Sequence, residues 1–155
     1  MKSLLISTVI GVALILGLPS TLHAAESDGA EIEVLLRNYE RALNASDVDG
    51  VLMLYAEDGV FMAPNNPSAV GIEQVETAYA AVFQAIDLNV EFEIVEIEVV
   101  SDAWAFARTN SAGTTTINAT GDKVAEGNQE LFVLRKVEGD WKIARYGFST
   151  TNPRQ

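Results

Sequence analysis

The side chains that could do chemistry in this sequence are carboxylates, tyrosines, arginines, lysines and hydroxyls. The chain has no cysteine, and its one histidine, His23, lies at the end of an apolar N-terminal segment. For the rest of the chain this excludes a Ser-His-Asp or Cys-His mechanism, a disulfide, and a zinc site built on imidazole or thiolate. What remains is acid–base chemistry, for which we expect neither a metal nor a cofactor.

Glu130 is the most informative of these residues. It shares one face of a predicted strand with Phe132 and Leu134, and a carboxylate in such a row needs a partner. Arg108 and Arg145 lie beside aromatic residues on strand faces, so each could pair with Glu130 or hold a ligand carboxylate with its planar guanidinium. An arginine would keep Glu130 ionised, whereas burial without a cation would raise its pKa and make it an acid near neutral pH.

Aromatic side chains are the candidates for the walls of a pocket. Tyr39 lies on the apolar stripe of a predicted helix, where its hydroxyl either faces a ligand or finds a partner in the core. Aromatic residues at helix or strand spacing more often belong to the hydrophobic core. For the other aromatic residues the two alternatives are therefore a place in the core and a place in the wall of a pocket. The predicted ligand-binding residues are Tyr55, Phe61, Tyr79, Trp104, Arg108, Arg145 and Phe148.

The charge of the chain limits its partners. The formal net charge is −12, and the basic residues are scattered singly apart from Arg135-Lys136. Nucleic-acid binding requires a basic stripe that releases counterions from phosphates, so a nucleic-acid partner is excluded. A small apolar or carboxylate-bearing molecule is the expected ligand.

The N-terminal segment has the layout of a secretory signal peptide. Lys2 precedes an apolar run over residues 4–18, and small residues follow at Ala24 and Ala25. The run is shorter than the roughly 17 to 25 apolar residues that span a bilayer. We therefore predict a signal peptide over residues 1–24, one domain over residues 25–155, a periplasmic or secreted location, and no membrane association after cleavage.

The elements that must position these side chains follow from hydrophobic periodicity. Three helices are predicted: one beginning at Ser27 or Asp28 and ending near Ala45, a short one capped by Asp47, and one after Gly71. Residues 57–59 are predicted as a turn, residues 60–62 as a short strand and residues 64–68 as a loop. From Leu88 onward the period is two, which predicts four strands, over about 89–100, 103–116, 128–137 and 141–150.

The first of these long strands carries an irregularity. Apolar residues stand at even positions up to Ile94 and at odd positions from Val95, which predicts a β-bulge that bends the strand. A bent strand suits a sheet that curls around a helix. The fold class is therefore α+β, with three N-terminal helices packed on a curved, mainly antiparallel sheet that forms a cone with a pocket at its mouth.

Several segments then resemble a known superfamily. Residues 39–58, the helix start at Gly71 and the segment Trp141-Lys142-Ile143-Ala144 are similar to the nuclear transport factor 2-like, or cystatin-like, proteins. These include ketosteroid isomerases, scytalone dehydratase and SnoaL-type cyclases, and the C-terminal residues 141–153 most resemble the exported SgcJ/EcaC-type bacterial proteins. The resemblance covers nearly all of the predicted mature chain.

The resemblance implies a homodimer that binds a small molecule. It also implies which residues form the site. Tyr39 matches the tyrosine that donates to the oxyanion in ketosteroid isomerases, and Glu130 falls near their protonated aspartate, so both are predicted catalytic residues. The aspartate base of those enzymes falls on Ala63, before Pro64, and is missing. The expected function is small-molecule binding. If the protein is an enzyme, the expected activity is that of an isomerase, dehydratase or cyclase acting on an apolar carbonyl compound. The alternative is a non-catalytic association module like that of calcium/calmodulin-dependent kinases.

Overall fold

The computed structural model describes residues 21–152, with side-chain surroundings from residue 26 onward. Helices precede the long strands along the chain, as the periodicity predicts, and the fold is α+β. The elements in chain order are α1 (Thr21–Asn44), α2 (Val48–Leu52), β1 (Tyr55–Met62), β2 (Ala69–Val70), α3 (Ile72–Ala85), β3 (Ile86–Ser101), β4 (Trp104–Ile117), β5 (Lys123–Val137) and β6 (Asp140–Thr150).

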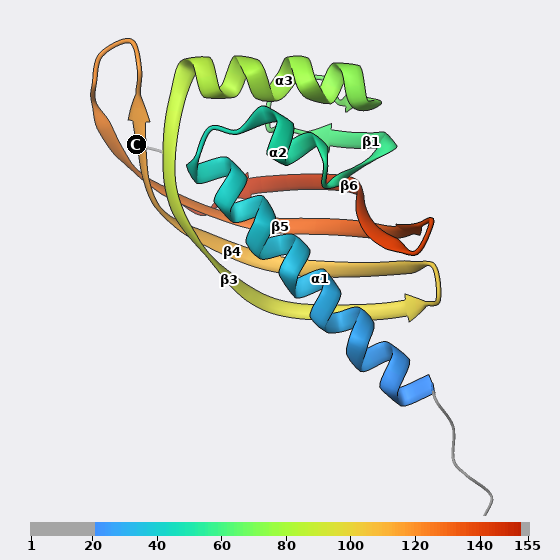
Figure 1. Cartoon of the computed structure of the whole chain (residues 1–155). Helices are drawn as coiled ribbons and strands as arrows, with labels where there is room; N and C mark the ends of the chain where they lie inside the picture. The colour runs from blue at the N-terminus through green and yellow to red at the C-terminus, as the bar shows by residue number, and fades with distance from the viewer. Residues whose placement is uncertain (1–20, 153–155) are drawn as a thin grey trace, which may run out of the picture.

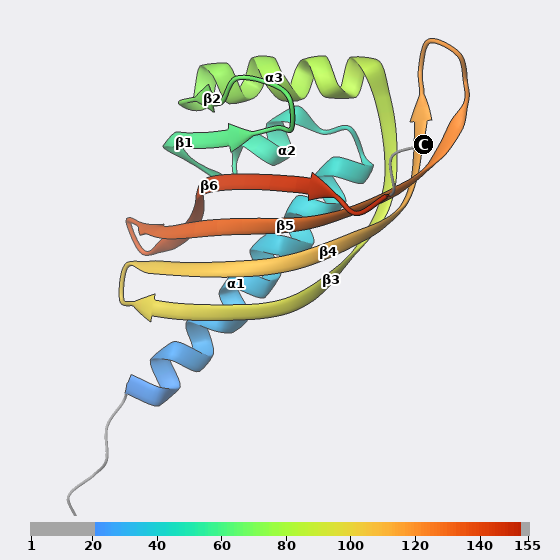
Figure 2. The same cartoon turned by 180° about the vertical axis from the view of Figure 1, so that it is seen from behind.

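The strands form one curved sheet of six strands, in the order β2-β1-β6-β5-β4-β3. All neighbours are antiparallel except β1 and β6, which run parallel. The helix α1 crosses the concave face, and α3 lies along the upper edge (Figure 1). From behind, the convex face carries no helix of residues 21–152 (Figure 2). The sheet therefore has an inner face toward the helices and an uncovered outer face.

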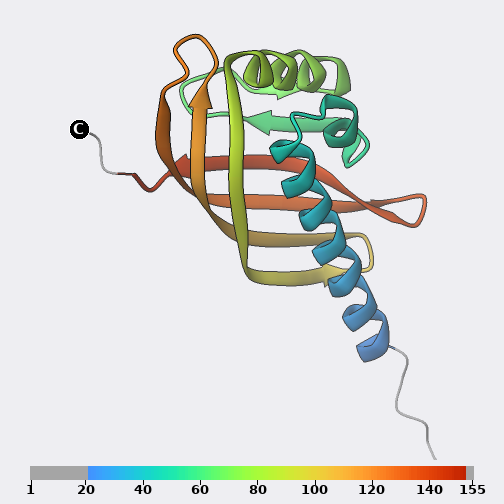
Figure 3. The same ribbon diagram turned by 60° about the vertical axis from the view of Figure 1, so that its left-hand side comes forward.

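The curl of the sheet produces the cone. The first half of β3 and the hairpin between β4 and β5 rise toward α3 (Figure 3). Gly113 of β4 lies opposite Val90 there, and a Cβ on Gly113 would come within 2.1 Å of the Asn89 carbonyl oxygen. Glycine is required at this point because the two backbones approach so closely.

Two bulges set which side chains point inward. In β3 the register shifts between Ile94 and Glu96, so the predicted bulge is confirmed, and Val95 is the unpaired, exposed residue. In β6 a second bulge lies between the pairs Leu134–Ile143 and Val133–Arg145. The extra residue reverses the alternation of β6 from that point, because successive side chains in a strand point to opposite faces.

The helices present the expected apolar stripes. Asp47 caps α2 by accepting a hydrogen bond from the Gly50 N–H at 2.9 Å, an interaction worth about 1 kcal/mol. The predicted start at Gly71 of α3 is confirmed. Buried residues of the two longer helices pack on the inner face of the sheet: Ile32, Leu35, Leu36, Tyr39, Leu43, Val75, Tyr79 and Phe83.

Two local predictions are wrong, and one short strand was not predicted. Helix α1 does not begin at Asp28; this residue lies within the helix, and its carboxylate accepts a hydrogen bond from the Trp141 Nε1 at 3.0 Å and pairs with Lys136. Residues 57–59 are part of β1 rather than a turn, since a bulge allows β1 to pair with β6 on both sides of them. The two-residue strand β2 was not expected. The predicted signal peptide lies outside the described residues, apart from residues 21–24 at the start of α1.

Candidate functional site

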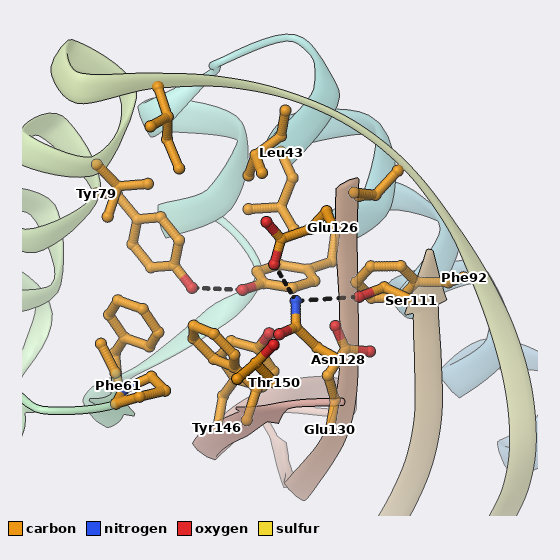
Figure 4. A pocket seen from close by; sticks show the side chains of 18 of the residues that line it. Leu43, Phe61, Tyr79, Phe92, Ser111, Glu126, Asn128, Glu130, Tyr146 and Thr150 are labelled. Carbon is orange, nitrogen blue, oxygen red and sulfur yellow. Dashed lines mark hydrogen bonds between the residues drawn. The ribbon is translucent and has the colours of Figure 1, made fainter. Parts of the chain in front are cut away.

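A cavity of about 400 Å³ lies between the inner face of the sheet and the helices. This is within the usual size range of small-molecule sites. Its walls are largely aromatic and aliphatic, with a polar strip on β4 and β5 (Figure 4). The residues that line it are Tyr39, Leu43, Phe61, Ala63, Pro64, Asn66, Tyr79, Val82, Ile86, Leu88, Val90, Phe92, Ser111, Glu126, Asn128, Glu130, Tyr146, Phe148 and Thr150.

Three of the four tyrosines of the chain, Tyr39, Tyr79 and Tyr146, line this cavity, and Tyr55 is bonded to Tyr79. The Tyr79 hydroxyl lies 2.5 Å from that of Tyr39 and 3.0 Å from that of Tyr55. Burial is the main cause that raises the pKa of Tyr39, Tyr55, Tyr79 and Tyr146 well above 10.0. These hydroxyls are therefore neutral, and they serve as hydrogen-bond donors rather than as bases.

The three linked hydroxyls leave one proton unused. Tyr39, Tyr79 and Tyr55 carry one hydroxyl proton each, and the two hydrogen bonds between them consume only two. Tyr39 and Tyr79 line the cavity, whereas Tyr55 lies behind Tyr79 and supports it. The cluster can thus offer a hydrogen bond to an oxygen atom of a bound ligand.

Stacked rings form a second wall. Phe61 stacks on Tyr79, with ring centroids 4.6 Å apart, and on Tyr146, at 5.7 Å. Phe148 stacks on Tyr146 at 5.9 Å. Tyr146 was not among the predicted site residues. The bulge in β6 turns it inward. The apolar positions of β6 change from odd at Trp141 and Ile143 to even at Ala144 and Tyr146, a phase slip that could have revealed this.

Glu130 lies on the inner face of β5 and is 6% exposed. Its carboxylate accepts a hydrogen bond from the hydroxyl of Thr109, the residue paired with it on β4. Burial raises the pKa of Glu130, and this outweighs the opposite effect of the Thr109 and Ser111 hydroxyls. Of the two alternatives drawn from the sequence, burial without an arginine partner is the one observed.

A strip of polar side chains continues from Glu130 toward the end of the hairpin. Asn128 Nδ2 donates to Glu126 Oε1 at 2.8 Å, and Thr115 Oγ1 donates to Glu126 Oε2 at 2.8 Å. The buried Asn128 Oδ1 has no hydrogen-bond partner among the described residues. Glu126 and Asn128 were missed from the sequence, although they stand at the same alternation as Glu130 and could have been placed on its face.

Three predicted ligand-binding residues lie on the outer face instead. Arg108 pairs with Glu96, Trp104 is 41% exposed beneath the guanidinium of Arg135, and Arg145 donates to the carbonyl oxygen of Asp58 at 3.3 Å. For Arg145 the cause is the β6 bulge, which turns it away from the face of Trp141. Neither arginine lines this cavity, so the expected arginine clamp is not part of it.

The place of the missing base also faces the cavity. Ala63 and Pro64 line it, so a methyl group stands where the resemblance expects a carboxylate. Asp58 cannot replace it, because its side chain pairs with Arg135 on the outer face. Within residues 26–152, no group of three or more acidic, histidine or cysteine side chains is arranged to hold a metal ion. No helix in the described part of the chain is long and apolar enough to cross a membrane.

The chain was compared with protein-family models and with curated proteins. The family model of the SnoaL-like domain matches residues 36–146. No curated protein matches the chain. The narrower likeness to exported SgcJ/EcaC-type proteins stays a prediction.

Solved structures share the fold over most of their length. A ketosteroid isomerase-like protein from Erwinia carotovora atroseptica is 38% identical, with a TM-score of 0.79 over 81% of this chain and 98% of that chain. A protein proposed to be a scytalone dehydratase, from Novosphingobium aromaticivorans, is 18% identical, with a TM-score of 0.75 over 85% and 89%. A Nostoc punctiforme protein of unknown function with a cystatin-like fold is 18% identical, with a TM-score of 0.65 over 82% and 92%. The latter two identities support the fold alone.

Proposed function

Because the chain belongs to the SnoaL-like domain family, within the nuclear transport factor 2-like superfamily, we propose that its cavity binds a small, mostly apolar carbonyl compound and turns it over without a cofactor. The reaction class is isomerisation, dehydration or cyclisation. The relative at 38% identity is named a ketosteroid isomerase-like protein, which agrees with this class.

The observation that carries the proposal is the buried Glu130 carboxyl in a cavity lined by neutral tyrosine hydroxyls. A carboxyl group whose pKa is raised can take up and return a proton closer to neutral pH. The tyrosines remain protonated and can donate to an oxygen on which negative charge develops. Acid–base catalysis and oxyanion stabilisation are thus both available in one cavity.

The proposed shared step is enolisation. Glu130, in its ionised form, accepts a proton from the carbon next to the ligand carbonyl, and the C–H electron pair moves so that the carbonyl oxygen becomes an enolate. Tyr39 or Tyr79 donates a hydrogen bond to that oxygen. Protonated Glu130 then returns the proton to another carbon, or to a leaving hydroxyl group. Ala63 leaves no second carboxylate at the position used by ketosteroid isomerases, so Glu130 serves in both directions.

Deuterium exchange tests this step without knowledge of the natural substrate. The protein is incubated with 1-tetralone, a bicyclic aromatic ketone, in D₂O, and the proton NMR signal of carbon 2 is followed. We expect its loss to be faster than in buffer, by about 10² to 10⁴-fold for a positioned general base. Glu130→Gln, which removes the base but keeps the shape, should abolish the acceleration. Glu91→Gln, on the exposed side of β3, is the matched control.

Two results would count against the proposal. Equal exchange rates for the wild type and a folded Glu130→Gln variant would remove Glu130 from the chemistry. If neither 1-tetralone nor related ketones bind or exchange, the non-catalytic association module becomes the better description. The open, partly polar cavity favours the small-molecule reading, because an association module needs no such space.

We further propose that the protein is a homodimer joined through the outer face of the sheet. Apolar side chains are exposed there, notably Met62, Trp104 and Leu131, which are 42%, 41% and 48% exposed. Exposed apolar patches of this kind commonly mark contact surfaces. Sedimentation equilibrium should report twice the monomer mass, and Leu131→Glu should reduce it to the monomer mass; an unchanged mass would refute this interface.

Export is proposed from the N-terminal sequence alone. The apolar run and the small residues at Ala24 and Ala25 support cleavage and a periplasmic or secreted location. Mass spectrometry of the protein isolated from its native cells should find an N-terminus at residue 25 or 26. An N-terminus at Met1 in the cytoplasmic fraction would refute it.

A further inference from the structure

One wall of the cavity is a strip of polar side chains that includes two carboxylates. Glu126, Asn128 and Glu130 occupy three successive inward positions of β5, and Ser111 and Thr109 lie opposite the last two on β4. Figure 4 shows this strip facing the aromatic side of the cavity. Of the residues in this strip, only Glu130 takes part in the proposed reaction.

The hydrogen bonds within the strip fix the orientation of the Asn128 amide. Its nitrogen donates to Glu126 Oε1 at 2.8 Å and lies 3.5 Å from the Ser111 hydroxyl oxygen. Exchanging nitrogen and oxygen would place two oxygens against each other at the carboxylate, which is unfavourable. The group left without a partner is therefore an acceptor, Asn128 Oδ1, on a side chain that is 8% exposed.

A buried acceptor without a donor destabilises the folded state, because its lost hydration is not replaced. Such a group is normally satisfied by a partner, which here must donate a hydrogen bond. Since Asn128 lines the cavity, a ligand bound there can supply that donor once the nearly inaccessible Oδ1 is turned toward it.

The charges around the cavity point to the kind of donor. None of the described residues that line it is lysine, arginine or histidine, whereas two are glutamates. Arg108 and Arg145, which the sequence offered as partners of Glu130, are engaged on the outer face. The Glu126 carboxylate receives only neutral donors, from Thr115 and Asn128. A cationic ligand group would therefore find carboxylate partners without a competing cation of the protein.

The opposite wall suits the same group. Phe61, Tyr146 and Phe148 form a stack of near-parallel rings. The negative faces of aromatic rings attract organic cations, most strongly where water is excluded. Acceptors on one side and ring faces on the other are the features that recognise an ammonium group attached to an apolar body.

We infer that the ligand of this cavity carries a protonated amino group, which donates hydrogen bonds to Asn128 Oδ1 and the Glu126 carboxylate while its apolar part lies against the aromatic stack. The inference rests on the proposed function, because it names a feature of the ligand of the same cavity. A hydroxyl group would supply one donor but no charge, and a carboxylate would be repelled by both glutamates.

Three probes of nearly equal size separate these cases: benzylamine, benzyl alcohol and benzoate. Binding to the purified full-length protein is measured by isothermal titration calorimetry and by ligand-observed NMR. We expect benzylamine to bind in a 1:1 ratio, at least tenfold more tightly than benzyl alcohol, and benzoate not to bind. Tenfold is the lower end of what a hydrogen bond to a charged group contributes.

Variants locate the binding. Asn128→Leu removes the free acceptor, and Glu126→Gln removes the charge but keeps the shape; each should weaken benzylamine binding about tenfold or more. Glu91→Gln removes the same charge from the exposed side of β3 and should leave binding unchanged, which separates the site from general attraction to an acidic protein. If Asn128→Leu does not fold, Asn128→Asp keeps Oδ1 and should bind benzylamine at least as tightly as the wild type.

The outcomes distinguish this inference from the proposed function. If benzyl alcohol binds as tightly as benzylamine, or Glu91→Gln weakens binding as much as Glu126→Gln, the amine assignment is wrong. If benzylamine does not bind but 1-tetralone exchanges its protons with dependence on Glu130, the amine assignment is also wrong and the proposed function stands. If neither binding nor exchange occurs, both are refuted.

Discussion

Replacing Tyr79 by phenylalanine tests the hydrogen-bonded core of the cavity. The ring and its stacking on Phe61 are kept, so nearly all of the buried area is unchanged and only the hydroxyl is lost. That hydroxyl is bonded to both Tyr39 and Tyr55, and all three residues are almost fully buried. The substitution therefore breaks two hydrogen bonds and leaves two buried hydroxyls without their partner.

The magnitude follows from the count of bonds. A typical hydrogen bond contributes about 1 kcal/mol to stability, and a buried group left unpaired adds its desolvation cost. We expect Tyr79→Phe to lower the free energy of unfolding by about 2–4 kcal/mol. Tyr55→Phe breaks only the bond to Tyr79 and should cost about 1 kcal/mol.

Urea unfolding followed by circular dichroism measures both values, and equal m-values would show that the denatured states are comparable. The reasoning depends on Tyr79 being the shared partner. If Tyr79→Phe lowers the free energy of unfolding no more than Tyr55→Phe does, the hydroxyls of Tyr39 and Tyr55 have paired with each other. That result would refute the loss of two hydrogen bonds in Tyr79→Phe.

Three further predictions concern charge and the site. Burial raises the pKa of Glu130 above its usual 4.5, so the ionised carboxylate costs stability in the folded state; Glu130→Gln should be more stable than the wild type at pH 8, and this advantage should disappear as the pH falls to 4, in urea titrations at both values. An advantage that is independent of pH would contradict this origin. Ala63→Asp places a carboxylate beside Pro64 in the cavity wall and should speed deuterium exchange of 1-tetralone at least tenfold over the wild type; a folded variant with an unchanged rate would show that the ligand does not reach Ala63. Arg108→Ala removes an exposed pair with Glu96 and should change ligand affinity by less than twofold, with stability altered by about 0–1 kcal/mol; a large loss of affinity would return Arg108 to the site.

Much of the fold could be predicted because its cause is local. The helical stripe containing Leu36 and Tyr39, the cap at Asp47 and the phase slip after Ile94 are each visible within a few residues of sequence. The wrong predictions depended on partners far along the chain. Asp28 lies inside a helix because Trp141 and Lys136 satisfy its carboxylate, and residues 57–59 extend β1 because β6 pairs beside them.

The candidate site shows the same division. Tyr39, Phe61, Tyr79, Glu130 and Phe148 line the cavity that their spacing and the family resemblance suggested. Arg145 was misplaced because the β6 bulge reverses the alternation after Ile143. Arg108 was misplaced because the two faces of a strand are equivalent until something covers one of them. The inner face is decided by which side α1 covers, and no feature of a single strand reports that.

The sequence by itself determined the chemistry available to this protein: carboxylates and tyrosines without a usable histidine or cysteine, on an α+β cone whose first long strand is bent. Only the tertiary structure decided which of these groups meet. It buried Glu130 without a cation, joined Tyr39 and Tyr55 through Tyr79, and left the Asn128 oxygen without a donor. The physical reason is that side-chain type is a property of one residue, whereas burial, charge pairing and hydrogen-bond satisfaction depend on residues that only folding brings together.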